Sequence, residues 1–273
     1  MTTSHHSIET YQVTFQDVDP SGRIHLHRLM DYAQDCDDRN CKLMGIDSQT
    51  LLAREACWLL IGNSLRFNGQ LPMAGEQLIV DSWSIRLDGI RFYRGNRYYR
   101  NQRSEDSLFG TGVSEWILAD VHQHRPLRPP KVLDIESFIA MSDPSADDSK
   151  ELTRLKPVLN PQLAPVRFEY LVGLGDIDMN THLHNTHYIR LALDAAARLL
   201  DLDPRRQDFS LQAFQIHYKA EIDYGDTLEI MADLDFDDPA WVNIEGRFGS
   251  GATTSFLARL RGSLIDRPRR GLV

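Results

Sequence analysis

The residues best suited to chemistry in this chain lie together at 175–189. This stretch, Gly-Asp-Ile-Asp-Met-Asn-Thr-His-Leu-His-Asn-Thr-His-Tyr-Ile, holds two carboxylates, two amides and three imidazoles. Buried polar groups each need a hydrogen-bond partner, so a segment this polar is poor material for a core. It leads into an amphipathic helical pattern, and a helix N-terminus offers free backbone N–H groups and a partial positive charge. The pattern therefore predicts a site that holds a developing oxyanion beside acid and base groups.

A weaker copy of this segment occurs at 17–27, as Asp-Val-Asp-Pro-Ser-Gly-Arg-Ile-His-Leu-His. In both places a short strand pattern precedes the loop, helical spacing of apolar residues follows it, and further strand patterns follow the helix. Asp17 and Asp176 are 159 residues apart, and His25 and His182 are 157 apart. The repeat predicts duplication of an α+β unit that has one long helix and several following strands.

A linker separates the two predicted units. The segment 144–163 is rich in Ser, Asp and Pro and shows little apolar periodicity, which is typical of a connection. We therefore expect an N-terminal unit at 1–143 and a C-terminal unit at 164–273. Strand patterns continue after each helix without further helices. An antiparallel sheet wrapped around a long central helix is thus favoured over a parallel βαβ arrangement.

Bulk composition limits the classes of function. The 273 residues are 42% hydrophobic and 25% charged, as in an ordinary globular protein, with no apolar run long enough to span a bilayer. The first residues lack the basic and apolar regions of a signal peptide, so we expect a cytoplasmic protein without membrane insertion. The net charge of −9 argues against nucleic-acid binding.

Neither a thiol site nor a metal site is predicted. Reduced and mostly buried thiols are expected for the three cysteines, which fall in or near apolar segments without a Cys-x-x-Cys pair: Cys36, Cys41 and Cys57. His182 and His184 have a spacing that a metal ion can use, but imidazoles without a nearby thiolate are not diagnostic. Asp176 stays equally open as a turn residue and as a site residue.

Three segments carry a family resemblance. The first, at 176–189, reads Asp-x-Asp-x-Asn-x-His-x-x-Asn-x-x-Tyr-Ile, and the second, at 216–221, reads Ile-His-Tyr-Lys-Ala-Glu. The third, at 114–130, begins with Ser-Glu-Trp and ends with Arg-Pro-Leu-Arg-Pro-Pro. Together they resemble the acyl-acyl carrier protein (acyl-ACP) thioesterases of bacteria and plant plastids. This resemblance spans most of the chain and implies an α+β fold of two tandem hotdog units.

The resemblance also implies an activity and the residues that perform it. The activity is hydrolysis of fatty acyl-ACP to free fatty acid and carrier protein, without a cofactor. The implied catalytic residues are Asp178, Asn180, His182 and Glu221. Plant members carry a Cys directly after that Glu, where this chain has Ile222. Activation of water is therefore expected in place of a cysteine nucleophile.

Each of these groups has a role in the attack of water on a thioester. Glu221 or His182 takes the proton from water, and the sequence does not decide which. Asn180, or a backbone N–H at the start of the helix at 185–200, stabilises the oxyanion. Asp178 orients His182. Strand alternation turns Glu221 away from the helix of its own unit, towards a seam between the units or a surface ion pair, unless a bulge intervenes.

The N-terminal unit has lost part of this set. At the 159-residue offset Ser21 stands where Asn180 stands, and at a 150-residue offset between two matching glycines Leu71 stands where Glu221 stands. We therefore expect one active site per chain. The resemblance implies that the N-terminal unit shapes the acyl pocket instead, with predicted lining residues Leu26, Met30 and Trp58.

Two other functions stay open at this point. An acyl-CoA thioesterase would use the same residues, whereas a non-catalytic acyl-binding or regulatory hotdog protein would bind acyl ligands without turnover. Retention of all four candidate groups argues against the second. The implied partner is an acyl carrier protein that bears a fatty acyl thioester. The sequence leaves open the preferred chain length and whether the protein forms a homodimer.

Overall fold

Two units of similar build make up the structure, a computed structural model that describes residues 6–159, 164–249 and 253–267. The first unit comprises residues 1–14 and 29–153, and the second comprises 15–28 and 154–273. The N-terminal loop at 15–28 therefore groups with the second unit. Of the segment expected to be a linker, 144–153 falls in the first unit and 154–159 in the second, while 160–163 lie outside the described residues.

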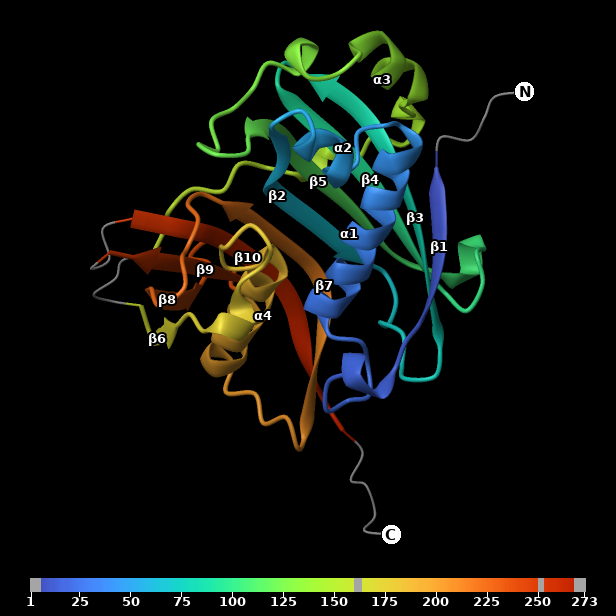
Figure 1. Ribbon diagram of the computed structural model, residues 1–273. Coiled ribbons are helices and arrows are strands. Elements are labelled where there is room, and N and C mark those ends of the chain that lie inside the picture. Colours follow the sequence, from blue (N-terminus) through green and yellow to red (C-terminus); the bar gives the residue numbers. More distant parts are fainter. Residues whose placement is uncertain (1–5, 160–163, 250–252, 268–273) are drawn as a thin grey trace. The chain divides into compact units, whose positions relative to one another are not determined.

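The first unit is an antiparallel sheet packed against one long helix (Figure 1). Its strand order is β1 (Ser7–Gln12), β3 (Gln77–Asp88), β4 (Arg91–Arg100), β5 (Leu108–Asp120) and β2 (Ala56–Phe67). The helices are α1 (Leu26–Leu43), whose first residues group with the second unit, and the shorter α2 (Ser48–Leu52) and α3 (Ile135–Met141). Gly89, with a φ of +62°, allows the two-residue reversal between β3 and β4.

The second unit repeats this plan. Its strand order is β7 (Gln207–Tyr218), β10 (Thr253–Asp266), β9 (Trp241–Phe248), β8 (Thr227–Leu234) and β6 (Val166–Leu171), and its long helix is α4 (Asn185–Leu199). The Tyr188 ring of α4 packs edge-on against Tyr218 and Phe256, with ring centroids 5.5 and 5.4 Å apart. Each unit therefore has the single long helix and following antiparallel strands that the sequence predicts.

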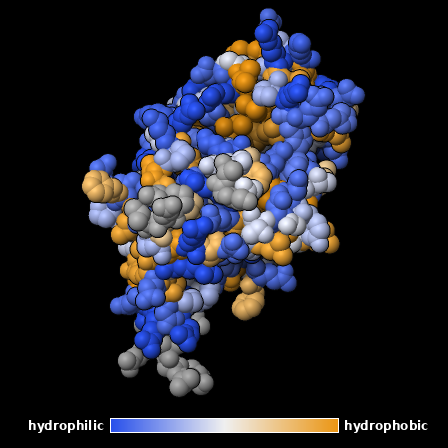
Figure 2. All heavy atoms as spheres, turned by 90° about the vertical axis from the view of Figure 1, so that its left-hand side faces the viewer, coloured by the Kyte–Doolittle hydropathy of each residue, from blue (hydrophilic) through white to orange (hydrophobic). Residues whose placement is uncertain are grey.

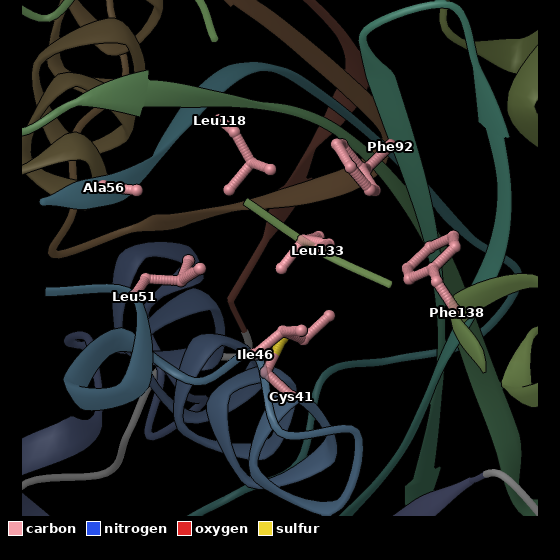
Figure 3. Close-up of a cluster of buried hydrophobic side chains, with 8 residues drawn as sticks. All are labelled: Cys41, Ile46, Leu51, Ala56, Phe92, Leu118, Leu133 and Phe138. Atoms are coloured by element: carbon pink, nitrogen blue, oxygen red, sulfur yellow. The ribbon is translucent and has the colours of Figure 1, made fainter. Parts of the chain in front are cut away.

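A buried hydrophobic cluster lies at the C-terminal end of α1 in the first unit (Figure 3). Phe92 contacts the Trp58 ring at 4.8 Å and the Phe138 ring at 5.1 Å between centroids, both edge to face. Such aromatic pairs add about 0.5–1.5 kcal/mol each beyond the area that they bury. The cluster consists of Cys41, Ile46, Leu51, Ala56, Phe92, Leu118, Leu133 and Phe138.

The described part of the expected linker is bound to the first sheet up to Thr153. Ala146 and Leu152 pack on a buried cluster that includes Trp83 and Tyr93. Arg86 of β3 pairs with Asp147 at 3.0 Å. This segment therefore covers the face of the sheet opposite to α1, because Trp83 alternates along β3 with serines that face the helix.

Surface character agrees with the composition. Apolar residues appear among hydrophilic ones on the face of the molecule seen in Figure 2, and singly exposed apolar residues are normal on a protein surface. Within the described ranges, no helix is both long enough and apolar enough to cross a membrane.

Candidate active site

Asp176 anchors the polar loop that precedes α4. One carboxylate oxygen accepts hydrogen bonds from the Tyr170 hydroxyl at 2.7 Å and the Gly173 N–H at 2.9 Å. The other lies 3.0 Å from Arg190 Nη2 and 3.1 Å from His187 Nδ1. Burial alone would raise the pKa of Asp176, but these donors together hold it below the ordinary value. Because both oxygens of its carboxylate already have hydrogen-bond or ion-pair partners, Asp176 is a positioning residue.

A tight turn after Asp176 presents the predicted catalytic residues. The Asp178 N–H donates to the His182 carbonyl at 3.0 Å, and the Thr181 N–H donates to the Asp178 carbonyl at 3.0 Å. Asp178 Oδ1 accepts the Asn180 N–H at 2.8 Å. Thr181 has a φ of +70°, a left-handed conformation that is strained for a β-branched residue and is typical of functional loops. Asp178 thus shapes the turn and is joined to His182 through the backbone.

His182 and Glu221 come together at this turn. His182 Nε2 lies 3.7 Å from Glu221 Oε2 and 3.5 Å from Asp223 Oδ1. A β-bridge between His182 and Asp223, with the Leu183 N–H donating to the Ile222 carbonyl at 2.8 Å, fixes the approach of the two segments. The His182 and Glu221 side chains are 21% and 43% exposed. Both side chains are accessible to water. Either one can therefore take a proton from a water molecule while the other lies beside it.

Glu221 reaches this position because its strand ends early. The strand β7 stops at Tyr218, and the N–H groups of Lys219 and Ala220 both donate to the Ser255 carbonyl, at 2.7 and 3.1 Å. Two residues opposite one partner is the irregularity of a β-bulge, which re-aims the residues that follow. Strand alternation therefore does not extend to Glu221, because β7 ends at Tyr218 and the next two N–H groups share one carbonyl.

The start of α4 is capped by the loop itself. His184 Nδ1 accepts the Thr186 N–H at 3.3 Å and lies 2.8 Å from Thr186 Oγ1. The Tyr218 hydroxyl donates to the Asn185 carbonyl at 3.1 Å. Burial and then the neighbouring Arg190 lower the pKa of His187. His184 and His187 therefore have packing and capping roles.

One acidic neighbour of His182 is missing from the sequence predictions, namely Asp223. It lies two residues beyond Glu221, in the turn between β7 and β8, and its N–H donates to Asp226 Oδ2 at 3.1 Å. The sequence signal that identifies Asp223 is an acidic side chain two residues after the predicted catalytic Glu221.

The N-terminal loop reproduces the backbone of this turn. The Asp19 N–H donates to the Arg23 carbonyl at 2.8 Å, and the Gly22 N–H donates to the Asp19 carbonyl at 2.9 Å. Asp19 Oδ1 accepts the Ser21 N–H at 2.7 Å. Gly22 has a φ of +83°, as Thr181 has a positive φ. Each residue lies 159 positions before its counterpart, so one scaffold serves both loops.

This register corrects the pairing of histidines at a 157-residue offset. The His25 N–H donates to the Asp17 carbonyl at 2.8 Å, just as the His184 N–H donates to the Asp176 carbonyl at 2.9 Å. His25 therefore matches His184, and Arg23 stands where His182 stands. The N-terminal loop retains the acidic residue but has lost the amide and the imidazole.

Among the predicted acyl-lining residues, Leu26 groups with the second unit, whereas Met30 and Trp58 belong to the first. Leu26 and Met30 are buried on α1, and the Met30 sulfur lies 4.0 Å from the Tyr98 hydroxyl. Trp58 instead packs on Phe92, and its indole N–H donates to the Ile46 carbonyl at 2.9 Å. Met30 and Trp58 thus pack against different neighbours.

The cysteines are poorly placed for nucleophilic chemistry. Cys36 and Cys41 are buried, and Cys57 is partly buried. Burial raises the pKa of Cys41 to about 11 and that of Cys36 further. A thiol is a weak nucleophile until it loses its proton, so buried thiols with raised pKa values are inert.

Comparisons with known proteins identify a family for this chain. Residues 5–134 match the model of the acyl-ACP thioesterase N-terminal domain, and residues 161–255 match that of the acyl-ACP thioesterase C-terminal domain. No curated protein matches the chain.

Solved structures resemble almost the full length of the chain. An acyl-ACP thioesterase from Bacteroides thetaiotaomicron matches with a TM-score of 0.76 and 16% identity, over 95% of this chain and 98% of its own. The 12:0-ACP thioesterase from Umbellularia californica matches with a TM-score of 0.75 and 14% identity, over 96% and 99%. A putative oleoyl thioesterase from Lactobacillus plantarum matches with a TM-score of 0.71 and 17% identity, over 97% of each chain. The predicted α+β fold of two tandem hotdog units is confirmed.

Proposed function

The chain belongs to the acyl-ACP thioesterase family and is a hydrolase of fatty acyl thioesters, and from this premise we propose its substrate and mechanism. The substrate is a fatty acyl-ACP, and the products are free fatty acid and carrier protein, formed in the cytoplasm. The observation that carries the mechanism is the approach of His182 Nε2 to Glu221 Oε2, at 3.7 Å, on a turn that Asp176 and Asp178 hold in place.

The reaction needs one water molecule and no cofactor. The pair of Glu221 and His182 takes a proton from water as the water oxygen attacks the thioester carbonyl carbon. Asn180 or a backbone N–H at the start of α4 stabilises the oxyanion. When the intermediate collapses, the carbon–sulfur bond breaks and the proton passes to the departing thiolate. Asp178 acts by shaping the turn that carries His182.

The acyl chain lies in the first unit under this proposal. Leu26 and Met30 are buried apolar residues of α1, and Met side chains adapt readily to different neighbours. Trp58 belongs to the cluster around Phe92, so an acyl chain contacts it only by extending further along α1. The N-terminal loop, with Arg23 at the position of His182, has no catalytic role.

Matched substrates test the proposal. Initial rates are measured with acyl-ACP and acyl-CoA of the same chain length, using the purified full chain. A higher kcat/KM for acyl-ACP supports the carrier protein as partner, and a higher value for acyl-CoA contradicts it. Tight binding of acyl ligands without turnover would instead show a non-catalytic acyl-binding protein.

A further inference from the structure

A buried layer of charged and polar side chains crosses the interface between α1 and the sheet of the first unit. Arg94 of β4, only 5% exposed, lies at its centre. Its guanidinium donates to Asn40 Oδ1 at 2.8 Å and to the hydroxyls of Ser82 and Ser84, each at 3.1 Å. Arg94 Nε lies 3.6 Å from Asp37 Oδ1. The layer thus joins α1 to two strands through an ion pair that is almost closed to solvent.

The remaining contacts hold the carboxylate of this pair in place. Asp37 Oδ1 accepts the Ser82 hydroxyl at 2.5 Å and the Asn96 amide at 2.8 Å. Among the described residues, Arg94 Nε has no acceptor within hydrogen-bond distance. A buried ion pair is often no more stabilising than apolar residues of similar size. Stability of the fold therefore gives little reason for charges at this place.

The layer separates two apolar regions along α1. Every second residue of β4 points to the same face of the sheet, and from Phe92 to Tyr98 this face is the one towards the helix. Its four residues are Phe92, Arg94, Asn96 and Tyr98. Tyr98 contacts Met30 on one side of the layer. On the other side Phe92 belongs to the hydrophobic cluster of Figure 3, which the ring of Phe138 helps to close. A hydrocarbon chain that lies along α1 on the Met30 side meets Arg94 before it reaches that cluster.

The second unit places apolar side chains between its helix and its sheet. Residues buried to 4% exposure or less include the following side chains from α4 and the sheet: Tyr188, Ala192, Ile230, Ile244, Phe256 and Leu260. The buried carboxylate Glu245 of this unit pairs with Arg247 of the same strand β9 at 2.9 Å. Among the residues that the structure describes, the almost buried ion pair that joins a helix to a sheet is therefore the one in the first unit.

Resting on the function proposed above, we propose that the Arg94–Asp37 layer is the end wall of the acyl pocket. The acyl chain displaces the flexible Met30 side chain and stops with its methyl end at the layer. Further methylenes would have to break the hydrogen bonds of Arg94 and leave desolvated charges against hydrocarbon, which is costly. The layer thus limits hydrolysis to acyl chains that end before Arg94, and Trp58 lies beyond the pocket.

A paired variant tests the wall. Asp37→Ala with Arg94→Leu removes both charges and some volume, so neither partner is left buried alone. The matched control is Asp147→Ala with Arg86→Leu, which removes an ion pair of the same residue types from the opposite face of the same sheet. The measurement is kcat/KM for acyl-ACPs of increasing chain length, with circular dichroism and melting temperature recorded for each protein.

The expected result is a shift of the profile in the paired variant alone. At about 0.8 kcal/mol per buried methylene, two carbons correspond to a change of about fifteenfold. Two substrates are compared: the longest acyl chain that the wild type accepts, and the chain two carbons longer that it rejects. In the paired variant, kcat/KM for the longer chain relative to the shorter one should rise by about this factor. A folded paired variant with the wild-type profile overturns the wall, and so does an equal shift in the control.

The wild-type protein supplies a second test that does not depend on folding of a variant. Three acyl-ACPs of the longest accepted chain length are compared. The first is unsubstituted, the second carries a hydroxyl at the end of the acyl chain, and the third carries a hydroxyl at mid-chain. A polar wall predicts that the terminal hydroxyl reduces kcat/KM much less than the mid-chain hydroxyl does. Equal losses overturn the wall. Absence of hydrolysis with every acyl-ACP overturns the proposed function instead, so the two failures are distinct.

Discussion

His182 Nε2 lies 3.7 Å from Glu221 Oε2, although one residue belongs to the loop before α4 and the other follows the end of β7. Two local features bring them together. The turn at Asp178 aims His182, and the irregular pairing of Lys219 and Ala220 with the Ser255 carbonyl re-aims Glu221. Backbone hydrogen bonds in the loop before α4 and after the end of β7 thus set the distance between His182 and Glu221.

Loss of either side chain should remove most of the activity. We expect His182→Ala and Glu221→Gln each to lower kcat by about 10²–10⁴-fold, the usual contribution of a positioned acid–base group. Both side chains are partly exposed, so circular dichroism and melting temperature should stay near wild type. Steady-state hydrolysis of acyl-ACP measures the effect. Near-wild-type turnover in a folded variant would remove that residue from the mechanism.

Asp223 should matter less than Glu221. Its side chain is 73% exposed and lies 3.5 Å from His182 Nε2. Exposed ion pairs contribute about 0–1 kcal/mol, so Asp223→Asn should lower kcat/KM by less than about fivefold. Parallel assays of Asp223→Asn and Glu221→Gln check this order. A larger loss in Asp223→Asn would exchange the roles of the two carboxylates.

Asp176 should control stability, and in a pH-dependent way. Its pKa is lowered in the folded protein, so its contribution is present above the unfolded pKa of about 3.9 and is lost as pH falls through the folded value. Asp176→Asn should lower the free energy of unfolding at pH 7 by about 1–3 kcal/mol, because buried donors lose a charged acceptor. Urea unfolding of both proteins should show this difference shrinking in acid. A constant difference at all pH values would contradict the ion-pair role.

The sequence predicted the duplicated plan and the polar loop because both are local patterns. Apolar spacing is visible within one segment, and so is the density of polar residues before α4. The contribution of Asp223 depends on a bridge between two distant segments, which no local pattern reports. The histidine pairing failed for a related reason. Two offsets that differ by two residues both align His with His, and only the hydrogen bond from His25 to Asp17 selects the correct one.

The N-terminal loop offers a matched control for the active loop. His25→Ala should leave kcat/KM within about twofold of wild type, because His25 matches His184 in the scaffold and not His182. Its counterpart for comparison is His182→Ala. Loss of activity in a folded His25→Ala variant, with an unchanged melting temperature, would contradict a single site per chain.

The absence of a thiol after Glu221 gives the sharpest test of mechanism. Cys36 and Cys41 are buried with raised pKa values, so attack by water is expected in place of an acyl-cysteine intermediate. A triple variant with Cys36→Ser, Cys41→Ser and Cys57→Ser should keep most of its turnover, apart from losses through packing. Its melting temperature separates such losses from chemistry.

Incorporation of labelled oxygen from water does not decide the question, because both routes place one solvent oxygen in the fatty acid. Mass spectrometry of the protein quenched during the first turnover does decide it. Water attack leaves the protein mass unchanged at every time point. An added acyl mass in the wild type that disappears in the triple variant would show that a cysteine carries the acyl group, and Glu221 would then act on the thiol or on its ester.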